Sequence, residues 1–304
     1  MARRSKTCDD SVTLARMNFG TLLVTSLFVI MVSCTLAIPA RSEWIALALM
    51  ICAGIPHGSF DLRVAEAKWR EGRVPRAAVL VGYLACVFGM SALCVFQPLV
   101  GLSLFLVISA AHFSEGERDS TVPPRLSRGV LFGIGAILVP IGLHVSQAQA
   151  YMGYFVPQSW FFENATAVKI TAVAWVVLIG IALAKDLAAS GGARNAEVLQ
   201  RLICLCAWIF LPPLAGFAVW FIGRHSRQHL EVCKEMFKGS RLGIPFDFIL
   251  ISILAIVGLA PFAVLFDFSD INQLFAAAIC LIAGLTLPHM IVSHGIRGVV
   301  SAKA

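Results

Sequence analysis

The sequence predicts an all-α protein, a polytopic bundle of transmembrane helices. Three observations predict it: 59% of the 304 residues are hydrophobic, only 13% are charged, and the mean hydropathy is +0.84. Soluble proteins carry charge on roughly a quarter of their residues. Apolar runs that approach the length needed to cross roughly 30 Å of hydrocarbon recur from Phe19 to Met290. We therefore expect an integral membrane protein.

Nine apolar runs are candidate membrane helices, and short polar loops separate most of them. The first run is longer than the apolar core of a signal peptide and leads into further spans, so we expect it to be retained. In chain order the runs cover residues 19–37, 44–57, 77–96, 99–112, 129–143, 165–184, 202–222, 246–266 and 274–290.

The chain reads as one domain, because no soluble segment, linker or internal repeat interrupts the runs. We expect a transmembrane domain over residues 19–294, a cytoplasmic N-terminal tail over 1–18 and a C-terminal tail over 295–304. The nine cysteines show no CxxC spacing and lie mostly within apolar runs. This pattern favours packing roles over disulfides or zinc binding.

The net charge of +7 comes from Lys and Arg in short loops between apolar runs. In membrane proteins such loops mark the cytoplasmic side, so the charge indicates topology and not nucleic-acid binding. The N-terminal segment and the loops after the second and fourth runs are basic, whereas the first and third loops contain only Arg41. We expect a multi-pass protein of the cell's inner (plasma) membrane with both termini in the cytoplasm.

The seventh run, residues 202–222, conflicts with a simple count of nine crossings. If every run crossed, the basic loop after it would be outside, and His225 and His229 would lie across the membrane from the other histidine motifs. Pro212 and Pro213 interrupt this run, and proline breaks helical hydrogen bonding. We expect about eight full crossings with a broken or re-entrant segment at 202–222. The alternative is a proline-kinked full span whose topology departs from the charge rule.

Four histidines occur where apolar runs end in polar residues. His57 lies in Pro-His-Gly-Ser-Phe-Asp, His112 in Ala-His-Phe-Ser-Glu-Gly-Glu, and His225 and His229 in Arg-His-Ser-Arg-Gln-His. Ionisable groups at membrane depth are costly and usually serve a function. His225 and His229 are four apart and would share one helix face. Any one histidine alone could be a hydrogen-bonded interfacial residue, but the set predicts a metal site.

The ligand type favours iron. Imidazole suits iron, copper and zinc, and four neutral imidazoles leave open positions on an octahedral Fe2+ ion. No cysteine or carboxylate cluster accompanies the histidines, so we expect iron in an oxygen-using enzyme and not a structural zinc.

Other polar residues are candidates for the second shell of such a site. Asp61 and Glu115 follow the first two histidine motifs and could orient imidazole rings. Asp61 could instead be a helix-end charge, and Glu115 and Glu117 could be solvated loop acids. His289 is a candidate extra ligand or second-shell donor, and His144 is expected to be structural.

These motifs, together with Leu-Pro-His-Met at 287–290, resemble the Brp/Blh family of membrane β-carotene 15,15'-dioxygenases. The resemblance spans most of the chain and depends on the order and spacing of the histidines. It implies cleavage of the central double bond of β-carotene by dioxygen at a non-haem iron, giving two molecules of retinal. It also implies that His57, His112, His225 and His229 are the iron ligands.

A carotenoid substrate fits the hydrophobic composition. β-Carotene dissolves in the lipid bilayer, and apolar and aromatic side chains are the usual lining of a site for such a ligand. The aromatic residues nearest the histidine motifs, and therefore the candidate polyene contacts, are Phe60, Phe113, Trp220 and Phe221. A retinal-binding rhodopsin is a candidate acceptor of the product.

Two other classes remain open from the residues alone. A membrane di-iron desaturase or hydroxylase would need about eight histidines, often in HxxxH and HxxHH clusters, whereas this chain has seven with a single HxxxH. A haem-binding membrane protein or a metal transporter would use two histidines or a conduction path. Metal content and absorption spectrum separate these classes.

Overall fold

The computed structural model describes residues 2–69, 75–117, 125–189, 193–237 and 244–294, and these contain helices and no strand. The predicted tail 295–304 lies outside the described residues. The helical elements are α1 (Ala2–Ala37), α2 (Pro39–Leu49), η1 (Met50–Gly54), η2 (Ile55–Phe60), α3 (Asp61–Trp69), α4 (Arg76–Phe96), α5 (Pro98–Gly116), α6 (Arg125–Leu143), α7 (Val145–Met152), α8 (Gln158–Ala188), α9 (Ala193–Phe210), α10 (Pro213–Trp220), η3 (Phe221–Ser226), α11 (Arg227–Met236), α12 (Ile244–Leu259), η4 (Ala260–Val264) and α13 (Ile271–Ser293).

The predicted all-α polytopic bundle is confirmed. Six helical segments of the described chain are long and apolar enough to cross a membrane, or seven if the bent pair α6 and α7 counts as one span. The expected figure of about eight crossings is therefore approximate. The helix α1 begins at Ala2, so residues 2–18, expected to be a tail, continue the first span as helix.

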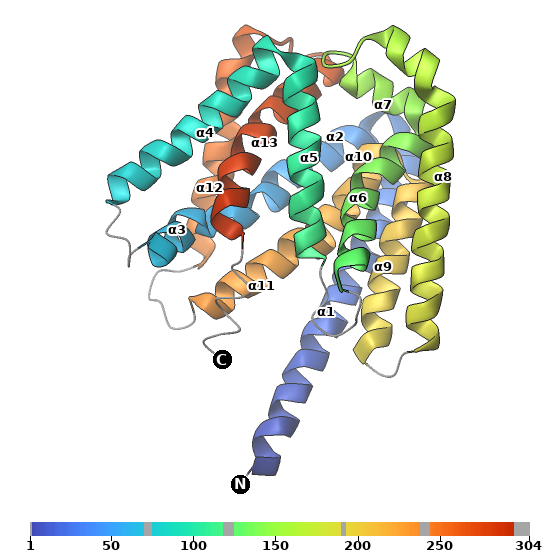
Figure 1. Ribbon diagram of the computed structural model, residues 1–304, viewed down its shortest axis with the longest axis vertical. Coiled ribbons are helices and arrows are strands. Elements are labelled where there is room, and N and C mark those ends of the chain that lie inside the picture. The colour runs from blue at the N-terminus through green and yellow to red at the C-terminus, as the bar shows by residue number, and fades with distance from the viewer. Residues whose placement is uncertain (1, 70–74, 118–124, 190–192, 238–243, 295–304) are drawn as a thin grey trace.

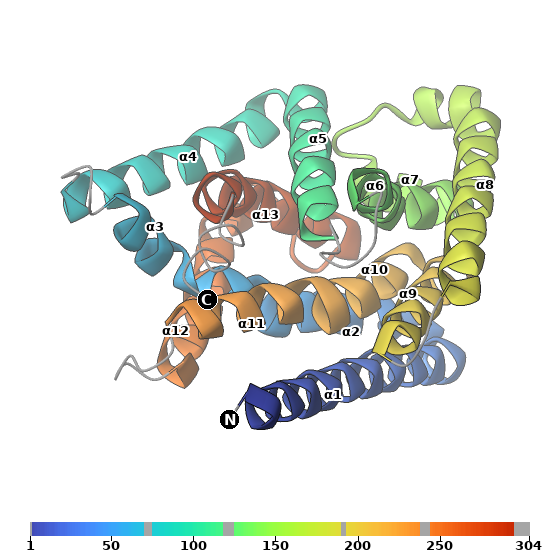
Figure 2. The same cartoon turned by 60° about the horizontal axis from the view of Figure 1, so that its bottom comes forward.

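The helices form a bundle with a slanted arm on one side (Figure 1). The helix α8 stands at one side beside α6 and α9, and α4 slants away at the other side next to α13. The helix α1 begins at the end of the molecule toward which α13 runs. Figure 2 shows α11 lying across this end, so the segment with His229 caps the bundle instead of running through it.

The interruption predicted in the seventh run is present. The helix α9 ends at Phe210, Pro212 caps α10, and Pro213 is the first residue of α10. Proline fits the first turn of a helix because the missing N–H would have no partner there. Seven of the eight residues of α10 are buried, among α1, α2, α6 and α9. A broken segment is tolerated at membrane depth when protein surrounds it in this way.

The outer faces of the helices suit lipid. Large apolar side chains such as Phe88 on α4 and Ile170 and Val177 on α8 are more than half exposed. In water such faces would promote aggregation, but in a bilayer they meet a solvent of matching polarity. The apolar groups at the surface and the buried polar groups inside indicate a multi-pass membrane protein.

Small residues bring the helices that carry the polar groups close together. A Cβ atom on Gly133 of α6 would lie 2.3 Å from the backbone nitrogen of Ser114 on α5. Close approach of this kind is common between membrane helices, where packing and not water exclusion drives association. The contact fixes α6 against the turn of α5 that holds His112.

We predict that Gly133→Ala destabilises the protein by about 1–3 kcal/mol, because the added methyl group would collide with backbone that cannot move aside. The measurement is the melting temperature in detergent. The matched control is Gly180→Ala on α8, where an added Cβ would meet nothing within 4 Å. This control should be neutral or stabilising by up to about 1 kcal/mol. Equal melting temperatures for both variants would refute the packing argument.

Candidate metal centre

Five histidines from five helical elements lie close together inside the protein. His57 comes from η2, His112 from α5, His225 from η3, His229 from α11 and His289 from α13. Each is at most 9% exposed. The four histidines expected to converge therefore lie in one group, and His289, a candidate extra ligand or second-shell donor, lies among them.

The imidazole rings contact one another edge to face. The ring centroid of His57 is 5.4 Å from that of His225, 5.5 Å from that of His229 and 4.7 Å from that of His289. His112 is 5.0 Å from His225 and 4.9 Å from His289 by the same measure. His229 is 4.9 Å from His289. These contacts define a histidine cluster of five residues, which name we keep below.

The cluster fits a metal ion. Ligand atoms of His57, His112 and His289 lie within 4.8 Å of one another, as do those of Asp61, His229 and His289. The Nε2 atoms of His225 and His289 are buried and have no hydrogen-bond partner among the described residues. A buried polar group left in this state costs about 1–3 kcal/mol. A bound cation would satisfy Nε2 of His289, which belongs to both groups of ligand atoms, whereas His225 belongs to neither group.

The cluster also favours uncharged imidazoles. His225 follows the broken segment and lies outside the candidate spans. Burial and the four neighbouring histidines lower the pKa of His225 well below its ordinary value. A neutral imidazole keeps a lone pair available, which is the form that binds metal.

Irregular helix geometry positions two of the motifs. The π-helix η3 contains His225, and the π-helix η1 ends three residues before His57. The two π-helices pack against each other. A π turn contains an extra residue and therefore changes the direction of the side chains that follow, and such turns are frequent at functional sites.

Asp61 orients one ring of the histidine cluster. Its Oδ1 lies 2.8 Å from Nδ1 of His289, and the hydroxyl of Tyr83 donates a 2.9 Å hydrogen bond to its Oδ2. With Nδ1 held by a carboxylate, Nε2 of His289 is the nitrogen left for an ion, as in many metal sites. We expected Asp61 to orient an imidazole, and the ring that it contacts is His289.

The acids that follow His112 have different environments. Glu115 pairs with the exposed His294 at 3.1 Å, so this contact lies at the surface. The expectation that Glu117 is a solvated loop acid is wrong, because Glu117 is 2% exposed and is paired with arginines. Burial alone would raise its pKa, but Arg224 and Arg201 lower the pKa of Glu117 to about 2.

Three of the four expected aromatic contacts surround His225. Trp220 and Phe221 stack on its ring, with centroids 5.4 and 5.6 Å away, and Phe113 meets it edge-on at 4.9 Å. Phe60 instead stacks on Phe237 at 5.9 Å in a separate apolar cluster. The first three rings therefore form one wall of the histidine cluster.

Cys233 and His144 each make a polar contact inside the protein. Cys233 is buried, and its Sγ lies 3.4 Å from Nε2 of His229, a contact that the sequence pattern did not predict. His144 has its Nε2 3.3 Å from the carbonyl oxygen of Trp208. A structural role for His144, as expected, agrees with this contact.

Comparison with known proteins supports a single family. The sequence model of the family described as Beta-carotene 15,15'-dioxygenase matches residues 48–296. A protein named Beta-carotene 15,15'-dioxygenase, from an uncultured marine bacterium (66A03), is 28% identical over 200 residues, which cover 62% of this chain and 68% of that protein. No solved structure matches the chain.

We predict that Asp61→Asn lowers the affinity of the purified protein for Co2+ by about 10- to 100-fold, because an amide no longer holds the ring of His289 as a carboxylate does. Titration against a chromophoric chelator measures the affinity. Asp267→Asn is the matched control, since Asp267 lies in an exposed turn and accepts hydrogen bonds from Ser269. Wild-type affinity in Asp61→Asn would exclude Asp61 from the support of the site.

Proposed function

The chain belongs to the β-carotene 15,15'-dioxygenase family, and on that premise we propose that it is a non-haem iron enzyme that splits the central double bond of β-carotene. One molecule of dioxygen is consumed, and each of its atoms ends in the aldehyde group of one of two retinal molecules. The substrate, the cofactor and the site of cleavage are all parts of this proposal.

The observation that carries the proposal is the meeting of His57, His112, His225 and His229 within a membrane protein. The ring centroids are 5.4 Å apart for His57 and His225, 5.5 Å for His57 and His229, and 5.0 Å for His112 and His225. We propose these four as the Fe2+ ligands, with His289 as a fifth ligand or as a donor beside them. Bound iron would supply the activation of dioxygen.

The protein's own groups would hold the ion and shield the site from water. The neutral imidazoles would keep the ion in place, and Asp61 fixes the ring of His289. Phe113, Trp220 and Phe221 form an aromatic wall beside His225, which excludes water and offers flat apolar contacts to a polyene. Which double bond is cut would then depend on how far the polyene extends past this wall.

The histidine count disfavours the di-iron alternative. Five of the seven histidines form the cluster, while His144 contacts a backbone carbonyl and His294 pairs with Glu115 near the surface. Two irons would have to share five imidazoles and the carboxylate of Asp61. A single ion would have enough ligands from the same groups, whereas two ions would not.

We place the protein in the inner (plasma) membrane with both termini in the cytoplasm. The beginning of α6, the end of α8 and the beginning of α9 lie at the end of the bundle where α1 begins (Figure 1). The first two of these segments carry Arg128 and Lys185, whereas the turn before α13 carries Asp267 and Asp270. By the positive-inside rule the basic end faces the cytoplasm. Delivery of retinal to a rhodopsin at this membrane belongs to the same proposal.

We predict that expression of the chain in a β-carotene-producing cell removes the orange colour and yields retinal. His57→Ala, His112→Ala, His225→Ala and His229→Ala should each abolish retinal formation at unchanged protein level, because each removes one ligand. The readouts are chromatography of extracted pigments and a blot of the membranes.

His144→Ala is the matched control, since His144 lies outside the histidine cluster, and this variant should still form retinal. Wild-type retinal from one of the four variants would remove that residue from the ligand set. Unchanged pigment in a well-expressed, iron-replete wild-type culture would contradict the function itself.

A further inference from the structure

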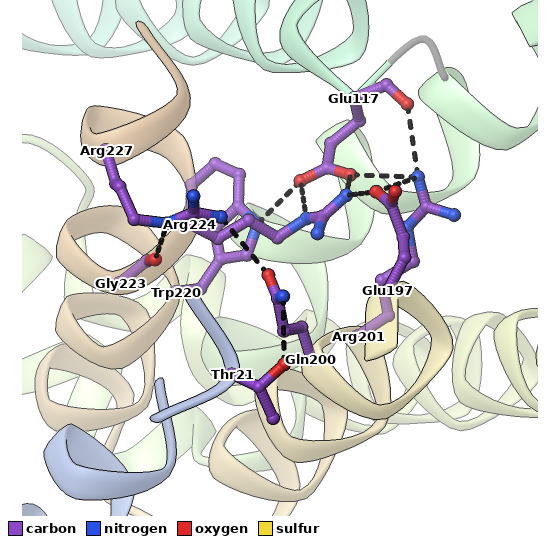
Figure 3. A network of polar contacts seen from close by, with 9 residues as sticks. All are labelled: Thr21, Glu117, Glu197, Gln200, Arg201, Trp220, Gly223, Arg224 and Arg227. Atoms are coloured by element: carbon purple, nitrogen blue, oxygen red, sulfur yellow. Dashed lines mark hydrogen bonds and ion pairs between the residues drawn. The ribbon is translucent and has the colours of Figure 1, made fainter. Parts of the chain in front are cut away.

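Figure 3 shows a network of two acids and two arginines, in which Trp220 takes part, and Trp220 also stacks on His225 of the histidine cluster. The central contact of this network is a two-point ion pair between Arg224 and Glu117. The Nε atom of Arg224 donates to Oε1 of Glu117 at 2.7 Å, and Nη2 donates to Oε2 at 2.9 Å. Both side chains are 2% exposed. A paired fork of this kind fixes orientation as well as distance.

Trp220 and Arg201 also donate hydrogen bonds to Glu117. The indole nitrogen of Trp220 donates to Oε1 of Glu117 at 3.2 Å, and Nη2 of Arg201 lies 3.5 Å from Oε2 and from the backbone oxygen of Glu117. Arg224 also donates to Glu197 at 2.6 Å. Glu117 therefore joins the end of α5 to residues of α9, α10 and η3.

Stability alone is a weak reason for such a network. Moving charged groups out of water is costly in free energy, and proteins in which apolar side chains of similar shape replace a buried ion pair are often as stable or more stable. Its distinctive property is geometric, because several fixed donors restrict one carboxylate to a single position. The question is which nearby group needs that position to be fixed.

The positions of Glu117 and Arg224 in the chain identify the groups that need this fixed geometry. Glu117 caps α5 directly after the turn with His112 and Phe113, and Arg224 directly precedes His225 in η3. Trp220, which donates to Glu117, also stacks on the ring of His225. The ion pair thus links the backbone segments of two proposed ligands, and one of these segments is an irregular π turn.

We propose that Glu117 is a positioning residue for the metal site: its pair with Arg224 fixes the π turn relative to α5 and so directs the ring of His225 toward His112. The inference rests on the proposed metal-binding function. Glu117 belongs to neither candidate group of ligand atoms, so it acts through the segments that carry the ligands.

A second layer of polar contacts fixes the other side of the same turn. Arg227 donates to the carbonyl oxygen of Gly223 at 3.1 Å and to Gln200 at 3.2 Å, and Gln200 donates to Thr21 on α1 at 3.1 Å. The turn is therefore held from both flanks, by Glu117 on one and by α1 and α9 on the other (Figure 3). A segment with π geometry needs such support, because its own hydrogen bonds do not select it over a regular α turn.

The test is Glu117→Gln, which keeps the shape but replaces one acceptor oxygen with an NH2 group that faces the donors of Arg224. We expect the affinity of the purified protein for Co2+ to fall at least about tenfold, as for loss of other groups that support ligands. The visible absorption bands of bound Co2+ should also change, because the ligand geometry changes. In retinal-forming assays kcat should fall while KM for β-carotene changes little.

The matched control is Asp186→Asn, which disrupts another buried ion pair, that of Asp186 on α8 with Arg128 on α6. This variant should lower the melting temperature yet keep the Co2+ affinity and spectrum of the wild type. If Glu117→Gln only lowers the melting temperature, with unchanged Co2+ affinity and spectrum, Glu117 is structural and the inference is overturned.

Arg224→Lys covers the case in which Glu117→Gln does not fold. Lysine keeps the charge but loses the two-point fork, so we expect a folded protein with a smaller loss of Co2+ affinity. Wild-type affinity in folded Arg224→Lys would overturn the inference while the proposed function stands. Failure of the wild type to bind Co2+ or Fe2+ would instead overturn the proposed function, and the positioning role with it.

Discussion

The burial of five imidazole rings in a largely apolar bundle is the constraint on which the rest of the structure depends. Rings with lone pairs and N–H groups do not gather in an apolar interior unless something there binds them. Two of the five present a buried nitrogen with no hydrogen-bond partner in the described chain. A bound cation would resolve this conflict, and the surrounding helices would keep water and lipid away from it.

The unusual features of the fold serve that constraint. The segment broken at Pro212 lets α10 enter the protein core, and the π turn after it brings His225 and then His229 to the cluster at the end of the bundle. The helix α13 carries His289 into the same place, where its ring pairs with Asp61, which in turn accepts a hydrogen bond from Tyr83. The other long helices form the outer shell, and their exposed apolar faces match the membrane. A rigid shell around an irregular centre is what a site of this kind requires.

Much of this arrangement was predictable from local sequence. Hydropathy located α5, α8 and α13, the two prolines located the break after α9, and the polar ends of apolar runs identified the residues of the cluster. The rest depends on contacts between distant residues. Asp61 and His289 are 228 positions apart, and no local pattern indicates that they pair. The π turns and the burial of Glu117 likewise arise from packing, so a glutamate in a polar loop motif was indistinguishable from a solvated one.

X-ray absorption at the iron edge tests the central claim most directly, because it measures the ligands of the ion itself. For the Fe2+-loaded wild type we predict nitrogen and oxygen neighbours only, with the outer-shell scattering of at least four imidazoles. In His225→Ala this imidazole contribution should fall by one ring. Sulfur in the first shell, or iron without imidazole scattering, would contradict the account.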